Sequence, residues 1–352
     1  MFCARNGLEQ LKAYDMEEAA LPVKLDANEL PGQFDCELQQ IIIKKLSSLP
    51  LNRYPQIAAS NLRQQLADGH GLSKENILVG NGSSELLGAL CFAFGGKGRK
   101  IIYPHPSFSM YGVYASLSDS EAIAFPLDKT YQVPVKQFAD KIKQTNPSLV
   151  ILCNPNNPTG NVMLQEDIEY IVKNANCPVV VDEAYYEFYG QSSLPLLTNY
   201  PNLVITRTFS KAYGLAAARI GYLAAQPPIT DVVGKVLLPY HSNALSLAIA
   251  EVVYDNRDRL IPSVKAIVAE RERLSDSLQS VRDIQVFPSQ TNFLLLQLPR
   301  ATELTQWLKA RGISVRDFSK YPELENCIRV TVGTIEENNR VAEAIQTFFK
   351  RG

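Results

Sequence analysis

Three short apolar runs constrain the fold of this chain more than any other feature. They are LVILCN at 149–154, PVVVDEAY at 178–185 and LVIT at 203–206. Each is rich in β-branched residues and lacks polar alternation, which is typical of strands buried on both faces. Similar strands at 77–80 and 100–104 alternate with helical patterns. The alternation predicts an α/β fold built on a doubly wound, mainly parallel sheet.

The last third of the chain has a different pattern. Helical periodicity dominates from about 240 to 280, and a strand, a helix, two strands and a last helix follow between 291 and the end. This order predicts a smaller α+β domain, and 352 residues suit two domains. We therefore expect an N-terminal arm at 1–35, a large domain at 36–240 and a small C-terminal domain at 241–352.

Composition excludes several classes of function. The formal net charge of −1 gives no general reason to expect a nucleic-acid or membrane partner. Six cysteines without a C-x-x-C pair and three scattered histidines offer no metal-ligand spacing. The start of the chain has no apolar signal segment, and no run of eighteen apolar residues occurs. These features predict a soluble cytoplasmic protein with reduced cysteines and no metal.

Lys211 lies just after the LVIT strand, in the phrase TRTFSKAYGLAAARIGY at 206–222. A lysine partly withdrawn from water has a depressed pKa, so its amine can act as a nucleophile toward a carbonyl cofactor. Ser210 and Arg219 offer a hydroxyl and a fork of donors to an anionic group such as a phosphate. The alternative is an ordinary surface lysine on a loop.

Polar residues also follow the other strands. GNGSSE at 80–85 leads into a helix whose first N–H groups could bind an anion, and Asn157 lies in the tight loop NPNNPTG. Asp182 ends the PVVV strand, and Tyr185 follows three residues later. A buried carboxylate needs a cation, and a protonated pyridine nitrogen of a pyridoxal cofactor would serve. Taken alone, these segments could be a glycine turn, a loop and a helix N-cap. Together, at the carboxyl ends of strands, they predict one ligand site.

The motifs resemble those of a known family. NPNNPTG, DEAY, TFSKAYGLAAARIGY and CIRVTVGT are similar to the fold-type I aminotransferases that use pyridoxal 5′-phosphate, and the resemblance runs from about residue 24 to the end. KLDANELP, NRYP, GNGSSELL, PSFSMY and GISVRDF follow the running order of the histidinol-phosphate aminotransferases. The resemblance implies a large domain that binds the cofactor, a smaller C-terminal domain and an N-terminal arm.

The resemblance also implies roles for the residues that bind the cofactor. Lys211 would form the covalent link and move the proton, Asp182 would hold the pyridine N–H, and Tyr185 with Asn157 would contact the 3′ oxygen. Phe108 occupies the position of the aromatic side chain that stacks on the ring. The cofactor phosphate would be bound by Ser83, Ser84, Ser210, Arg219 and, from the neighbouring subunit of a homodimer, Tyr54.

The resemblance also implies which residues bind the substrates. Arg329 would bind an amino-acid carboxylate, Arg316 a substrate phosphate, and Tyr14 and Asn28 would help to close the pocket. The implied reaction is reversible amino transfer between L-histidinol phosphate and 2-oxoglutarate, a step in histidine biosynthesis. A threonine-phosphate decarboxylase and an aromatic amino-acid aminotransferase are the alternatives within this fold. A cofactor-sensing regulator is a further alternative, but the arm is too short for a fused DNA-binding domain.

Overall fold

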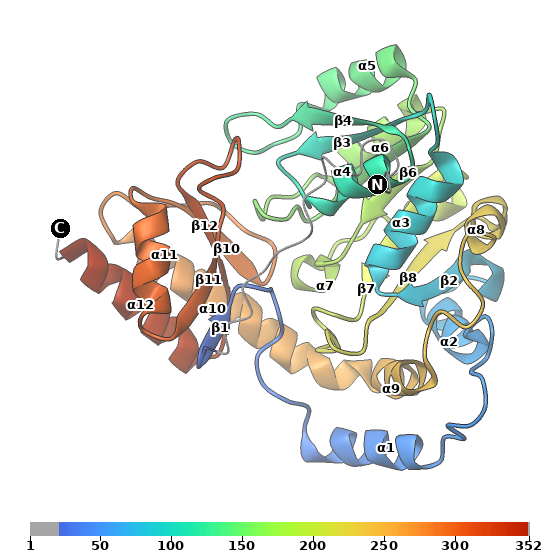
Figure 1. Ribbon diagram of the computed structural model, residues 1–352, viewed down its shortest axis with the longest axis horizontal. Helices are drawn as coiled ribbons and strands as arrows, with labels where there is room; N and C mark the ends of the chain where they lie inside the picture. Colours follow the sequence, from blue (N-terminus) through green and yellow to red (C-terminus); the bar gives the residue numbers. More distant parts are fainter. Residues whose placement is uncertain (1–20, 351–352) are drawn as a thin grey trace, which may run out of the picture.

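The computed structural model describes residues 21–350, which form two β-sheets with helices packed around them (Figure 1). The larger sheet has the order β2 (Ile77–Asn81), β8 (Ile220–Ala225), β7 (Leu203–Thr208), β6 (Val179–Asp182), β5 (Leu149–Cys153), β3 (Lys100–His105) and β4 (Glu121–Pro126). Only β8 runs antiparallel to its two neighbours. The predicted mainly parallel sheet is confirmed, and the carboxyl ends of the other six strands share one edge.

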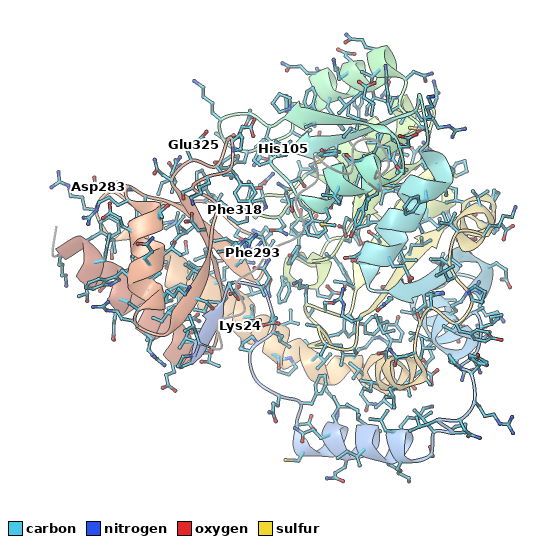
Figure 2. All side chains as sticks on the ribbon, in the orientation of Figure 1. Lys24, His105, Asp283, Phe293, Phe318 and Glu325 are labelled. Carbon is cyan, nitrogen blue, oxygen red and sulfur yellow. The ribbon has the colours of Figure 1, made fainter. Side chains whose placement is uncertain are left out.

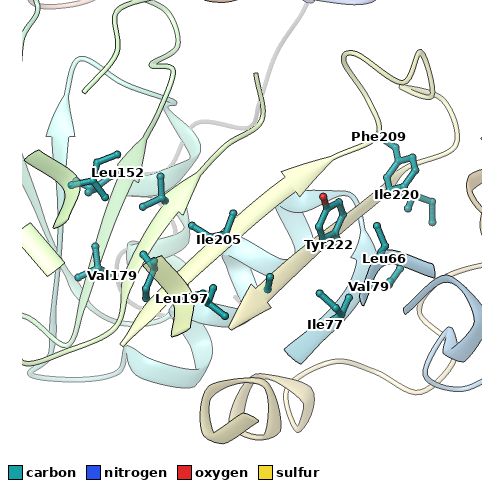
Figure 3. Packing of buried hydrophobic residues seen from close by; sticks show 14 of the residues in the cluster. Leu66, Ile77, Val79, Leu152, Val179, Leu197, Ile205, Phe209, Ile220 and Tyr222 are labelled. Carbon is teal, nitrogen blue, oxygen red and sulfur yellow. The ribbon is translucent and has the colours of Figure 1, made fainter. Parts of the chain in front are cut away.

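Helices cover both faces of this sheet. One face packs against α2 (Ser60–His70), α5 (Val135–Thr145), α6 (Gln165–Asn174) and α9 (Ala244–Asp255), and the other against α3 (Ser83–Phe94), α4 (Met110–Leu117) and α8 (Pro227–Gly234). Along β5 the side chains alternate between the two cores: Val150 and Leu152 enter the first, which Figure 3 shows in part, and Leu149 and Ile151 the second. Both faces are covered, so the strand sequences are continuously apolar.

The smaller sheet has five strands in the order β1 (Val23–Leu25), β11 (Ile313–Asp317), β12 (Cys327–Thr331), β10 (Phe293–Gln297) and β9 (Gln285–Val286). Three helices, α10 (Ile261–Gln279), α11 (Ala301–Lys309) and α12 (Ile335–Lys350), pack on one face of it. Alternate residues of β10, Phe293 and Leu295, belong to separate clusters on the other face. That face turns toward the large domain (Figure 1).

The domain limits remain predictions, and the structure describes the segments around them. Within the range expected for the arm, β1 pairs in parallel with β11 of the small sheet, and α1 (Cys36–Ser47) then packs on α9. The helix α9 follows residue 240 but packs in the core of the large sheet. The next long helix, α10, leads from there to the small sheet. No helix within residues 21–350 is long and apolar enough to cross a membrane.

Two strands of the large sheet, β4 and β8, are absent from the sequence-based prediction. β8 contains Gly221, and its small residues resemble a turn in the sequence. A β-carbon at Gly221 would lie 2.2 Å from the backbone nitrogen of Ser83, so a side chain there would collide with the start of α3. Because Gly221 has no side chain, β8 can lie directly against the N-terminus of α3, which the sequence predicts to bind an anion.

Candidate active site

A cavity of about 260 Å³ lies where the carboxyl edge of the large sheet faces the small sheet. Figure 2 shows Phe293 and Phe318 on the small domain, with His105 of the large domain opposite them. The cavity brings together twelve of the residues that the sequence predicts for the site: Asn28, Ser83, Ser84, Phe108, Asn157, Asp182, Tyr185, Ser210, Lys211, Arg219, Arg316 and Arg329.

Lys211 lies three residues beyond the end of β7, and its Nζ donates a hydrogen bond of 2.8 Å to the carbonyl oxygen of Ala27. Withdrawal from water and, to a smaller extent, the positive charge of Arg329 lower the pKa of Lys211 to about 7. A substantial fraction of the amine is therefore neutral at physiological pH. A neutral amine is the nucleophilic form, so this side chain can attack a carbonyl carbon.

Asp182 is the last residue of β6, with 3% of its surface exposed. Its Oδ2 accepts a 2.7 Å hydrogen bond from the hydroxyl of Tyr111, and its Oδ1 accepts a 3.1 Å bond from Thr206. Desolvation raises the pKa of Asp182 to about 6, while these two hydrogen bonds oppose the shift. A cationic donor such as a pyridinium N–H would stabilise the carboxylate, so this group fits a pyridine cofactor.

The start of α3 forms a corner that could bind an anion. Ser83 and Ser84 occupy its first two positions, after Gly82 at φ 78°. A β-carbon on Gly82 would lie 2.8 Å from Nη2 of Arg219, so this guanidinium lies directly against the start of the helix. Arg219 Nη1 also donates a 3.2 Å hydrogen bond to the hydroxyl of Ser210. Free N–H groups of a helix terminus beside hydroxyls and a guanidinium are well suited to a phosphate.

A second set of polar groups lies across the cavity. Asn28 Nδ2 donates a 2.9 Å hydrogen bond to the hydroxyl of Tyr185, which fixes that ring. Arg329 is 7% exposed and donates to Asn157 Oδ1 at 2.5 Å and to the carbonyl oxygen of Asp26 at 2.7 Å. Asn157 therefore keeps its amide nitrogen as the group that could contact a cofactor oxygen.

Arg316 and Arg329 are paired residues on the neighbouring antiparallel strands β11 and β12. Side chains that oppose each other in this way lie on the same face of a sheet, and like charges there repel. Both arginines line the cavity, and their guanidinium groups lie 5.9 Å and 5.6 Å from the ring of Phe318. An anion between them would relieve the repulsion, so this part of the cavity favours a ligand with a phosphate or carboxylate.

One predicted residue of the described chain, Tyr54, lies outside this cavity. Tyr54 is 80% exposed and stacks on Tyr240 with their ring centroids 4.5 Å apart, and it does not line the cavity of this chain. Tyr14 lies outside the described residues.

Three residues that the sequence analysis did not single out contact the site: Ala27, Tyr111 and Thr206. Tyr111 belongs to the motif PSFSMY, three residues after Phe108, whereas the contact of Thr206 with Asp182 follows only from the register of β6 and β7.

Comparison with known proteins agrees with this fold and site. Residues 22–345 match the model of the family described as aminotransferase class I and II. The chain is 38% identical over 342 residues to the histidinol-phosphate aminotransferase of Caldanaerobacter subterraneus subsp. tengcongensis, covering 97% of each chain. The chain therefore belongs to the class I and II aminotransferases. Within them, the resemblance to the histidinol-phosphate aminotransferases predicted from the motifs is confirmed.

Solved structures extend the comparison of the fold. Histidinol-phosphate aminotransferase from Sinorhizobium meliloti, solved in complex with pyridoxal-5′-phosphate, has a TM-score of 0.86 at 23% identity, over 94% of this chain and 92% of that one. L-Threonine-O-3-phosphate decarboxylase from Porphyromonas gingivalis has a TM-score of 0.83 at 25% identity, over 93% of this chain and 99% of that one. The predicted fold class is therefore confirmed, and the same fold serves two reactions.

Proposed function

We propose that the protein catalyses reversible amino transfer between L-histidinol phosphate and 2-oxoglutarate, giving imidazole acetol phosphate and L-glutamate, with pyridoxal 5′-phosphate as its cofactor. One observation carries the proposal: a single cavity combines a lysine of lowered pKa, a buried carboxylate, an anion-binding helix start and a pair of arginines. The relative that is 38% identical along nearly its whole length carries the name of this activity.

The residues fit the cofactor at each of its polar groups. Ser83, Ser84, Ser210 and Arg219 would bind its phosphate, Asp182 would hold its ring nitrogen, and Phe108 would stack on its ring. Asn157 and Tyr185 would contact the phenolic oxygen. When bound, pyridoxal phosphate supplies an aldehyde for covalent bonding to amines and a ring that accepts the electrons released with the α-proton.

The side chains of this protein would perform the remaining work. The substrate amine would displace Lys211 from its covalent bond. The freed neutral amine would then carry the α-proton at Nζ. Asp182 would keep a proton on the ring nitrogen through its negative charge. The carbonyl oxygen of Ala27, 2.8 Å from Nζ, would orient the lysine before each turnover.

The arginine pair would accommodate two substrates in turn. Arg316 would bind the phosphate of histidinol phosphate, and Arg329 would bind the carboxylate of glutamate. Asn28 supports this arrangement because its amide fixes Tyr185 beside Arg329. A threonine-phosphate decarboxylase remains a second candidate, since the same pair could bind the phosphate and carboxylate of one phosphorylated amino acid.

A substrate panel would test the proposal. Purified enzyme with pyridoxal phosphate would be assayed with 2-oxoglutarate and histidinol phosphate, phenylalanine or tyrosine, and separately with threonine phosphate for release of carbon dioxide. We expect glutamate formation to be fastest from histidinol phosphate. Carbon dioxide from threonine phosphate without amino transfer would identify the decarboxylase. Faster turnover of phenylalanine would identify an aromatic aminotransferase.

Arg316→Ala should impair the phosphorylated substrate far more than glutamate. A hydrogen-bonded charge contributes about 1.5–3 kcal/mol, so kcat/KM for histidinol phosphate should fall by about 10- to 150-fold. The value for glutamate should fall by less than about 5-fold, because Arg329 remains. Arg311→Ala, which removes a guanidinium packed on Trp307 outside the cavity, is the matched control. Equal losses on both substrates would contradict the role of Arg316.

A homodimer with shared sites is the proposed assembly. Its support is a group of exposed apolar side chains around the stacked pair Tyr54 and Tyr240, which also includes Leu51, Ile57 and Leu238. Such a group is typical of a protein interface, and Tyr54 would then reach the cofactor phosphate of the partner. Analytical ultracentrifugation would detect the dimer; a monomer at micromolar concentration would contradict it.

A cytoplasmic location is proposed as well. Five cysteines within residues 21–350 are free thiols, as expected in a reducing compartment. Cell fractionation would test it, and recovery of the enzyme outside the cytoplasmic fraction would contradict it.

A further inference from the structure

We infer that Tyr111 is a positioning residue of the reaction: its hydroxyl holds Asp182 in the ionised form that faces the cofactor ring nitrogen. The inference rests on the proposed function, because it assigns a partner to the carboxylate of that same site. The sequence motifs give no role to Tyr111. Its role follows from one buried contact, from the chemistry of the two groups and from the rings around them.

The contact is short and enclosed. Tyr111 lies in the first turn of α4, has no exposed surface, and donates its hydroxyl to Asp182 Oδ2 at 2.7 Å. Burial raises the pKa of Tyr111 well above its usual value, and the negative charge of Asp182 raises it further. The phenol therefore stays protonated throughout the physiological range. Toward an ionised Asp182 the phenol is the donor, and a carboxylate is a stronger acceptor for it than a neutral carboxyl group.

The Tyr111 hydroxyl offsets part of the free-energy cost of burying the charged form of Asp182. Burial alone favours the protonated, neutral form of Asp182, whose pKa is raised to about 6. Hydroxyl donors from Tyr111 and Thr206 stabilise the carboxylate instead, one at each oxygen. When a ring nitrogen shares a proton with this carboxylate, weaker donation to Asp182 makes the carboxylate more basic. The proton would then move from the nitrogen to Asp182, and the ring would lose the positive charge that makes it an electron acceptor.

The other titratable groups that face Asp182 do not replace this donor. Burial raises the pKa of Cys153, Tyr114 and Tyr185, so all three are neutral near pH 7. Glu183, whose negative charge raises the pKa of Asp182, is itself paired with Arg207 at 2.9 Å. The neutral donors that favour ionised Asp182 are therefore the hydroxyls of Tyr111 and Thr206 and the backbone N–H of Ala184. Of the two side-chain bonds, that from Tyr111 is the shorter, at 2.7 Å against 3.1 Å.

The same ring also supports the stacking position. Tyr111 meets the ring of Phe108 edge-on, with centroids 5.5 Å apart and an interplanar angle of 83°. It also meets the ring of Tyr103, with centroids 5.9 Å apart and an interplanar angle of 63°. Tyr111 thus contacts the carboxylate expected at the ring nitrogen and the aromatic side chain expected on the ring face. Tyr103 provides a matched comparison, because it is a buried tyrosine of the same cluster with no hydrogen bond to Asp182.

The first experiment needs no cofactor. In the apoprotein, the carboxyl carbon of ¹³C-labelled Asp182 would be titrated by NMR in wild type, Tyr111→Phe and Tyr103→Phe. Loss of one strong donor should raise the pKa of Asp182 by about one unit in Tyr111→Phe, and Tyr103→Phe should match wild type. An unchanged pKa in Tyr111→Phe would overturn the inference and leave the proposed function intact. Failure to bind pyridoxal phosphate at all would instead overturn the proposed function.

The second experiment reads the ring nitrogen of the bound cofactor. With ¹⁵N-labelled pyridoxal phosphate, the resonance of Tyr111→Phe should move toward that of a neutral pyridine, and the cofactor Kd should rise by about 10-fold. A resonance identical to that of Tyr103→Phe would contradict the role. If Tyr111→Phe does not fold, 3-fluorotyrosine at position 111 keeps the ring and hydroxyl and makes the phenol a stronger donor. In that protein the pKa of Asp182 should be lower than in wild type, and an unchanged pKa would again reject the inference.

Discussion

Lys211→Ala should lose amino transfer by at least about 10⁴-fold, because one change removes both the covalent nucleophile and the group that moves the α-proton. The variant should still bind pyridoxal phosphate, since the anion-binding corner at Ser83, Ser84 and Arg219 is intact. Bound cofactor should therefore lose its covalent attachment without losing most of its affinity. Borohydride reduction followed by mass spectrometry would measure this directly, as an adduct on the wild-type chain and none on the variant.

Lys173→Ala is the matched control for this experiment. Lys173 is an exposed lysine of α6 that pairs with Glu169 at 3.0 Å, and such surface pairs contribute little. This control should retain full activity and the adduct. Substantial amino transfer by Lys211→Ala, or an adduct on another lysine, would reject the assignment.

The lowered pKa of Lys211 adds a dependence on pH. The amine is protonated below about 7 and neutral above it, so the neutral fraction increases as the pH rises through that value. Covalent capture of pyridoxal phosphate by the wild-type apoprotein should therefore accelerate between pH 6 and 8, by up to about 10-fold for a fully coupled amine. Stopped-flow absorbance would measure the rate. A rate that instead rises by about 100-fold over this range, without levelling off, would show that the lysine has an ordinary pKa in the folded chain.

Local sequence patterns were sufficient for most of the fold because both faces of the large sheet are buried. The strands β5 and β6 have no polar residue before Asp182, so their ends coincide with the first polar residues of the sequence. The strand β7 continues through Arg207 to Thr208, beyond its apolar run, because its residues are buried there as well. β4 escaped detection because it is an edge strand with mostly exposed or half-exposed residues. β8 escaped because its approach to α3 requires Gly221, and glycine weakens a strand pattern.

Some residues of the candidate site could likewise be predicted from local sequence, and others could not. Residues at the ends of strands, such as Asp182 and Lys211, could be predicted because parallel strands bring their carboxyl ends to one edge. Contacts set by register or by a neighbouring helix could not. Thr206 faces Asp182 only because β6 and β7 align those two residues, and Tyr111 reaches it from α4. Nothing in the local sequence around either residue indicates a carboxylate partner.

The position of Tyr54 illustrates a different limit. A motif resemblance assigns it to a cofactor phosphate, but within this chain it is an exposed side chain stacked on Tyr240. A role that depends on a second subunit cannot be derived from one chain. The arginines were assigned by the same resemblance, but both lie within this chain, on paired strands of one sheet, so the structure brings them to one face.

Asp182→Asn should reduce kcat/KM by about 10³-fold, the size expected when one preorganised charge at a reacting centre is removed. An amide of the same shape cannot hold a proton on the ring nitrogen through negative charge, so the ring becomes a poor electron acceptor. Steady-state kinetics with histidinol phosphate would measure the loss. Asp140→Asn, on the exposed surface of α5, is the control and should behave as wild type. Retention of more than about a tenth of the activity by Asp182→Asn would contradict the role, since one lost charged contact alone costs more.

The same variant should change how the stability of the apoprotein depends on pH. The pKa of Asp182 is about 6 in the folded chain and 3.8 in the reference state, so between these values the folded form holds a proton that the unfolded form has lost. Wild-type stability from this group is therefore present below about 4 and is lost as the pH rises through about 6, by about 3 kcal/mol in all. Urea unfolding of both apoproteins from pH 4 to 7 would measure it. The wild-type free energy of unfolding should fall relative to that of Asp182→Asn as the pH rises, and a constant difference would show that Asp182 has an ordinary pKa when no cofactor is bound.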